Sequence, residues 1–287
     1  MIYIVEISLV IVAHQILVSK SLSLKDGNSW ADEYPACGGE HQSPIDIPSQ
    51  NVINKTYDPP FIVHNEDVMP LSMTLNNVGT GLKLEFRYPT KKTDFITGGP
   101  LTHGYYVLGE ISFVWNRKQS AGSAHTVDGK SYALEMYADY YRIVYESIDN
   151  AQNFEDGIIT ITSFWEESSF EAGTALSKIT SKLSEVIEPG SHADVEPFKF
   201  SELRKDPGHT TTYFAYNGSQ LIPPCAPVTW IISDYIYSIT SDQLGAFQAI
   251  KFENDDDDHN ARPVQPLNGR EIFKFTKELE DSSLTDF

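Results

Sequence analysis

The stretch Leu82-Lys83-Leu84-Glu85-Phe86 alternates apolar and charged residues along its whole length. Because successive side chains of an extended strand point to opposite faces, its three apolar side chains would share one face and its two charged side chains the other. Similar runs rich in Val, Ile, Phe and Tyr recur through the chain between Gly, Pro, Asn and Asp, which predicts strands joined by turns. The predicted strands cover residues 82–88, 105–115, 132–145, 157–164, 213–216 and 228–239.

Helical patterns are few, and the chain shows no internal repeat. Residues 172–187 carry apolar side chains at a spacing near 3.6 and end before Pro189-Gly190, which predicts one helix. A second helix is predicted over residues 244–252, with Ser241 as its N-cap. The sequence therefore predicts a single β-dominated domain of the α+β class, from about Trp30 to Phe275, with helices at its periphery.

Charge limits the partners that this chain can take. The 287 residues include 21 Lys and Arg against 40 Asp and Glu, a net charge of −19, while 40% hydrophobic residues are enough for a sizeable core. A field of that sign repels phosphate backbones, sulfated glycans and anionic lipids, so we predict no nucleic-acid partner. The exception would be a local basic patch such as Arg87, Lys91 and Lys92.

The first residues form the one membrane-like segment of the sequence. Residues 2–18 are mostly apolar, and the longest run without Glu, His or Gln is 7–13, which suits a signal peptide better than a membrane-spanning helix. We therefore predict a signal peptide over 1–21, cleaved beside Ser19 and Ser21, and a mature chain without a membrane span. The alternative is a buried N-terminal helix or strand.

Two further features favour export. Asn54-Lys55-Thr56 and Asn217-Gly218-Ser219 fit the acceptor pattern for N-glycosylation. The chain also has two cysteines, Cys37 and Cys225. In an oxidising compartment they could pair and stabilise the fold by roughly 2–4 kcal/mol. The alternative is two unrelated buried thiols.

Several short blocks in a fixed order are similar to the α-class carbonic anhydrases. They are Gln42-Ser43-Pro44-Ile45-Asp46-Ile47, Gly98-Gly99-Pro100-Leu101, Gly122-Ser123 followed by His125-Thr126-Val127-Asp128-Gly129-Lys130 and Tyr132-Ala133, Tyr216-Asn217-Gly218-Ser219 leading to Pro223-Pro224-Cys225, and the block from Asn260 to Arg270. The resemblance covers about residues 30–275.

The resemblance implies a large, mostly antiparallel twisted sheet of about ten strands with helices outside. It implies a disulfide between Cys37 and Cys225, as in extracellular members. It also sets the expected domain organisation: the signal peptide over 1–21, the carbonic anhydrase-like domain over 22–275, and an acidic C-terminal tail over 276–287.

The family's chemistry needs zinc, held by three histidines with water in the fourth position. Bound zinc lowers the pKa of that water to roughly 7, so that hydroxide attacks carbon dioxide. The resemblance assigns the three histidine positions to Ser112, Val114 and Tyr137. Valine has no donor atom, and serine and a neutral phenol are poor zinc ligands. We therefore expect no metal and no cofactor, unless zinc binds at a displaced site.

The other catalytic positions implied by the resemblance are also replaced. Glu110 stands where the family has Gln beside the first histidine, and Ala124 where it has Glu. The Thr-Thr pair before Pro-Pro is Leu221-Ile222, and the proton-shuttle position falls near Thr80. Glu135 keeps the family's residue, and we expect structural roles for His125, Glu135 and Arg262.

The remaining candidate metal ligands are sparse. None of the eight histidines forms a His-x-His or His-x3-His pair. The run Asp255-Asp256-Asp257-Asp258 lacks the spacing and glycine of an EF-hand loop. We expect it to be a solvated loop, with a weak divalent cation site as the alternative.

Three hypotheses for function follow. The first is a secreted, catalytically inactive carbonic anhydrase-related protein that binds an extracellular protein or small ligand, or acts structurally, with its former active-site cone filled by its own side chains. The second is an active zinc hydratase with a displaced metal site. The third is an acidic extracellular protein that attracts cations or basic partners through its surface.

Overall fold

The computed structural model describes Leu24, Gly27 and residues 29–276, except 90–91, 102–103, 170–172 and 204–211. The predicted signal peptide over 1–21 lies outside the described residues. Of the predicted tail over 276–287 only Thr276 is described, and it ends the last strand rather than beginning a tail.

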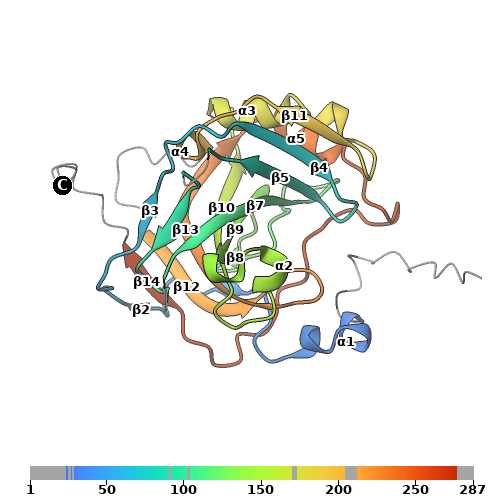
Figure 1. Ribbon diagram of the computed structural model, residues 1–287. Coiled ribbons are helices and arrows are strands. Elements are labelled where there is room, and N and C mark those ends of the chain that lie inside the picture. The colour runs from blue at the N-terminus through green and yellow to red at the C-terminus, as the bar shows by residue number, and fades with distance from the viewer. Residues whose placement is uncertain are drawn as a thin grey trace, which may run out of the picture.

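A twelve-stranded sheet dominates the described part of the chain (Figure 1). Ten strands follow one another across it, and the remaining two, β3 (Ile62–His64) and β6 (Phe95–Thr97), pair with each other beside β7. The order across the sheet is β11 (His192–Val195), β4 (Ser72–Asn77), β5 (Leu82–Arg87), β7 (Tyr106–Trp115), β9 (Leu134–Arg142), β10 (Ile158–Glu167), β13 (Pro227–Ile239), β12 (Thr212–Ser219), β14 (Phe273–Thr276) and β2 (Ile53–Asn54).

The predicted sheet-dominated single domain is confirmed, and most strand pairs are antiparallel as expected. Two pairs are parallel, β10 with β13 near the centre and β14 with β2 at one edge, so the sheet is mixed. A separate short ribbon pairs β1 (Asp46–Ile47) with β8 (Thr126–Val127), also in parallel. The predicted strand over 132–145 is shorter than expected, because residues 143–145 turn into a 3-10 helix, η2 (Ile143–Tyr145).

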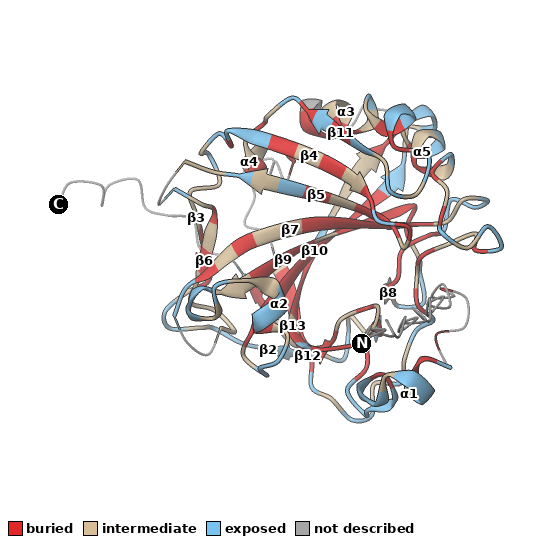
Figure 2. Cartoon of the chain, turned by 45° about the vertical axis from the view of Figure 1, so that its right-hand side comes forward, coloured by how far each residue is buried: buried red, intermediate tan, exposed pale blue. Residues whose placement is uncertain are grey.

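The helices are short and lie outside the sheet. Figures 1 and 2 place α3 (Thr174–Thr180), α4 (Phe200–Leu203) and α5 (Ser241–Gln248) together near β11 and β4. The others are α1 (Trp30–Glu33), η1 (Pro35–Gly38), α2 (Ile148–Ala151) and η3 (Leu183–Glu185). No helix in this described part of the chain has the length and apolar character that a membrane crossing requires.

Both helix predictions needed correction. The periodic segment 172–187 contains α3 and then η3, with a break between them, although its apolar side chains are buried as the period required. The second helix begins at Ser241 and ends at Gln248, earlier than the predicted 244–252. Its N-cap is Thr240 and not Ser241, because the Thr240 side chain accepts from the Gln243 backbone while the Gln243 side chain accepts from the Thr240 backbone.

Alternation along the central strands divides the buried side chains between two cores. Figure 2 shows β7, β9 and β10 buried along most of their length. On β7, Ile111 and Phe113 join the larger core with the helices, whereas Val114 faces the smaller core on the opposite side of the sheet. On β9, Met136 joins the larger core and Tyr137 packs against the smaller one. The candidate site lies on this second face.

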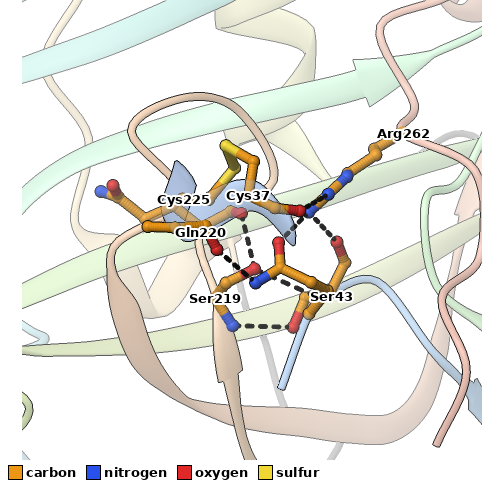
Figure 3. Close-up of a disulfide and its surroundings, with 8 residues drawn as sticks. Cys37, Ser43, Ser219, Gln220, Cys225 and Arg262 are labelled. Carbon is orange, nitrogen blue, oxygen red and sulfur yellow. Dashed lines mark hydrogen bonds between the residues drawn. A yellow bond between two sulfur atoms is a disulfide. The ribbon is translucent and has the colours of Figure 1, made fainter. Parts of the chain in front are cut away.

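The predicted disulfide between Cys37 and Cys225 is confirmed, with the two Cα atoms 5.1 Å apart (Figure 3). Arg262, 3% exposed, holds the same region together. Its guanidinium donates to Gln42 Oε1 at 2.7 Å, to the Ser43 carbonyl at 3.1 Å and to the Cys37 carbonyl at 2.8 Å. Burial lowers the pKa of this guanidinium from its usual value. Arg262 thus ties the first block of the sequence to the disulfide.

Candidate functional site

Two neighbouring strands bring the candidate residues onto one face. β7 contributes Glu110, Ser112 and Val114, and β9 contributes Glu135, Tyr137 and Asp139, each at every second position. The antiparallel register pairs them directly: Glu110 with Asp139, Ser112 with Tyr137, and Val114 with Glu135.

The three positions that the resemblance assigns to zinc ligands do converge. Ser112, Val114 and Tyr137 line one small cavity of about 20 Å³, together with Thr80, Leu221 and Ile222. A cavity of that size holds about one water molecule. Val114 and Leu221 are 2% and 3% exposed, so the base of the former cone is filled by its own side chains.

The side chains around this cavity do not suit zinc. Ser112 stands opposite Tyr137 in the strand register, and burial raises the pKa of the Tyr137 phenol, so it stays neutral. Val114 offers no donor atom. Zinc in proteins is held by thiolate, imidazole or carboxylate, and none of these stands at the three positions. The residues present therefore do not fit the family's metal.

Glu135 has a fully occupied carboxylate. Its Oε2 accepts the backbone N–H groups of Ala124 at 2.8 Å and His125 at 2.9 Å. Its Oε1 lies 2.7 Å from His125 Nδ1 and accepts from the Thr162 hydroxyl at 3.2 Å. Because four donors use both oxygens and the residue is 0% exposed, Glu135 cannot also serve a ligand.

His125 continues this buried network away from the cavity. Its Nε2 lies 2.7 Å from the Tyr216 hydroxyl, which lies 2.8 Å from the Ser43 hydroxyl. Ser43 in turn exchanges hydrogen bonds with Ser219, at 3.0 and 3.1 Å. Burial raises the pKa of Tyr216, which keeps this phenol neutral as well. The structure thus gives His125, a site residue of the sequence analysis, two ring contacts within the protein.

Asp139 is a site residue that the sequence analysis missed. It lines a second cavity of about 130 Å³, and it is 5% exposed. The Thr160 hydroxyl donates to its Oδ1 at 2.6 Å, and beside it Lys83 Nζ donates to Glu110 at 2.6 Å. Burial, with a contribution from the Glu110 charge, raises the pKa of Asp139 to about 7, against the opposing effects of the Thr160 hydrogen bond and Lys83. The signal in the sequence was its period-two spacing from Glu135 and Tyr137 on one strand.

The acidic run at 255–258 is more than the solvated loop that the sequence predicted. Asp257 is 1% exposed and its Oδ2 accepts the backbone N–H of Leu24 at 3.0 Å. Asp258 pairs with Lys118 at 3.1 Å and with His259 at 2.7 Å. Asp255 and Asp256 remain exposed. In the part of the chain that the structure describes, no three His, Cys, Asp or Glu side chains are grouped to hold a metal ion.

The surface positions singled out by the sequence are accessible where they are described. The side chains of Asn54 and Asn217 are both exposed, and Asn217 Oδ1 accepts from the Thr229 hydroxyl at 3.0 Å. Arg87 and Lys92 of the suggested basic patch are exposed, whereas Lys91 lies outside the described residues.

Comparison with known proteins identifies the relatives of this chain. The sequence model described as eukaryotic-type carbonic anhydrase matches residues 25–276. Human carbonic anhydrase 7 is 32% identical over 255 residues, which cover 86% of this chain and 93% of that protein. Human carbonic anhydrase 6 is 27% identical over 266 residues, covering 86% and 79%, and carbonic anhydrase 1 of Monodelphis domestica is 30% identical over 258 residues, covering 85% and 92%.

The network around Glu135 predicts a stability effect. Glu135→Gln replaces one acceptor oxygen with an NH₂ group that faces two of the four donors, so buried donors are left unsatisfied at about 1–3 kcal/mol each. We expect the free energy of unfolding in urea to fall by about 2 kcal/mol or more. Glu166→Gln is the matched control, because Glu166 pairs with Lys130 while both are about half exposed, and its loss should cost under about 1 kcal/mol. Equal losses for the two variants would contradict the role given to Glu135.

The environment of Asp139 predicts a pH dependence of stability. Its pKa rises from 3.8 to about 7 on folding, so between these values the folded state binds a proton that the unfolded state has released. The contribution of Asp139 to stability therefore falls as the pH rises through this window, and it is constant above it. Asp139→Asn should gain stability relative to the wild type between pH 5 and pH 8, measured by urea unfolding, whereas Asp194→Asn on exposed β11 should not. A difference that is the same at both pH values would show that Asp139 titrates normally.

Proposed function

The chain belongs to the eukaryotic-type carbonic anhydrase family, and from that membership and its own side chains we propose that it does not hydrate carbon dioxide and acts by binding or as a structural protein outside the cell. One observation carries this proposal. The strands that would present the family's three histidines present Ser112, Val114 and Tyr137 to one small cavity instead.

The surroundings support the same proposal. Hydration needs an ion that polarises water in an accessible cavity, and the matched positions offer a valine, a serine and a neutral phenol around about 20 Å³. Ala124, Leu221 and Ile222 stand where the family's orienting Glu and Thr-Thr would be. Glu135 is the same residue that the family has at this position, and its carboxylate accepts hydrogen bonds from the His125 ring, the Thr162 hydroxyl and two backbone N–H groups.

The alternative of an active hydratase with a displaced metal site lacks a ligand set within the described residues. The acidic surface supports a second route to binding, because a net charge of −19 favours cations and basic partners at low salt. Within it, Asp255 and Asp256 are the members of the acidic run left exposed for a weak divalent cation.

Secretion forms part of the proposal. The apolar segment within residues 1–21 fits a signal peptide, and the Cys37–Cys225 disulfide is of the kind that forms in oxidising compartments. Two glycosylation acceptors at exposed positions, Asn54 and Asn217, agree with passage through the secretory route.

Restoring histidines tests the loss of the metal site. Substituting Ser112→His, Val114→His and Tyr137→His together should raise zinc affinity by more than roughly a hundredfold, because three imidazoles then converge on one face. Competition with a chelating dye would measure this. The same three positions changed to Asn give a control with similar bulk and poor zinc donors. A wild-type chain that binds zinc as tightly as the triple-histidine variant would support the alternative, an active hydratase with a displaced metal site.

Export and glycosylation are tested together in a eukaryotic cell line. The full chain should appear in the medium, start after the predicted cleavage site, and lose mass on treatment with a peptide N-glycosidase. Asn54→Gln and Asn217→Gln should each remove one glycan from it. Retention of the unprocessed chain inside the cell would rule out secretion.

A further inference from the structure

The cavity of about 130 Å³ beside the former metal position is the feature that the proposed function leaves unexplained. It is called the Asp139 cavity below. Its lining includes Tyr137 and Asp139 on β9, Thr160 on β10 and Trp230 on β13, together with the charged residues Lys83, Glu110 and Asp149. The volume corresponds to about four water molecules, so it suits a ligand of a few non-hydrogen atoms.

Asp139 gives this cavity a carboxylate with unused capacity. The Asp139 residue is 5% exposed. The Thr160 hydroxyl donates to its Oδ1, and no described residue donates to its Oδ2. An acceptor oxygen on a cavity wall that no protein donor occupies can accept from a ligand that brings N–H donors or a positive charge.

The remaining charges leave the cavity negative. Lys83 and Glu110 lie 2.6 Å apart and offset each other, so they add little net field. Asp149, an exposed residue of α2, also lines the cavity and adds a further negative charge. No other cationic side chain lines the cavity. A low-dielectric pocket with excess negative charge concentrates cations.

Aromatic rings favour an organic cation over a hydrated metal ion. Tyr137 and Trp230 both line the cavity, and their ring centroids lie 6.0 Å apart in an edge arrangement. Aromatic rings attract ammonium groups, and a primary ammonium also supplies three N–H donors. A metal ion would need several oxygen ligands converging on one point, and no three His, Cys, Asp or Glu side chains in the described part of the chain are grouped to supply them.

We propose that the Asp139 cavity binds the primary ammonium group of a small organic amine, with Asp139 Oδ2 as its main acceptor and Tyr137 and Trp230 as its aromatic walls. This rests on the proposed function, because a zinc ion at the neighbouring position would repel a second cation. The ligand class differs from the family's neutral and anionic substrates, and it follows from the acidic residue on β9.

Proton competition makes the proposal measurable. The groups that face Asp139 are Glu110 on β7, Lys83 on β5, Tyr137 on β9 and Asp149 on α2, while β10 and β13 present Thr160 and Trp230, which do not titrate near neutral pH. Since the pKa of Asp139 is raised to about 7, a cation must displace a proton from it below that pH. Affinity should therefore fall about tenfold between pH 8 and pH 6.

The test uses the full secreted chain and methylammonium, with methanol as a neutral probe of the same shape and acetate as an anionic one. Binding is followed by calorimetry and by the indole NMR signal of Trp230. Methylammonium should bind, and methanol and acetate should not. Asp139→Asn should weaken binding at least tenfold, whereas Asp194→Asn, an exposed carboxylate on β11, should leave it unchanged.

Three results would overturn the proposal: no methylammonium binding, equal binding by Asp139→Asn with its fold intact by circular dichroism, or preference for acetate, which would assign the cavity to Lys83. Zinc content measured on the same samples separates this inference from the proposed function. A zinc-free chain that ignores methylammonium refutes only the ammonium site. A zinc-loaded chain refutes the proposed function, whatever it binds.

Discussion

The buried carboxylate of Glu135 is the constraint around which this side of the sheet is arranged. A charged group that is 0% exposed is tolerated only when its oxygens are fully hydrogen-bonded, and four donors from two segments of the chain converge on it. Through His125 and Tyr216 the same network reaches Ser43, and Arg262 then connects that segment to the disulfide. Each member of this network finds its hydrogen-bond partners within the protein, so the packing on this side of the sheet does not depend on a metal ion.

The changes above this network are mutually consistent. Ser112 and Tyr137 are register partners, and Glu110 and Asp139 are register partners beside Lys83 and Thr160. The first pair lines a cavity of about 20 Å³, and the second pair lines an acidic cavity of about 130 Å³. In our proposal, this face of the sheet holds no metal ion and attracts an organic cation instead.

Part of this architecture could be predicted from the sequence because it follows local rules, as strand alternation on β5 does. The pairing of Cys37 with Cys225 and the meeting of Ser112, Val114 and Tyr137 were expected from the resemblance to the α-class carbonic anhydrases. The features that the sequence did not predict depend on tertiary context. Burial of Asp257 against Leu24 and the raised pKa of Asp139 come from neighbours distant in sequence, and no pattern along one strand reveals them.

The central claim is that this chain keeps the family's scaffold without its zinc centre. Metal analysis by mass spectrometry, on protein secreted into zinc-supplemented medium and purified without chelators, tests it most directly. The account predicts far less than one zinc per chain, and no acceleration of carbon dioxide hydration by the same sample. One zinc per chain, together with hydration activity that a chelator abolishes, would contradict it.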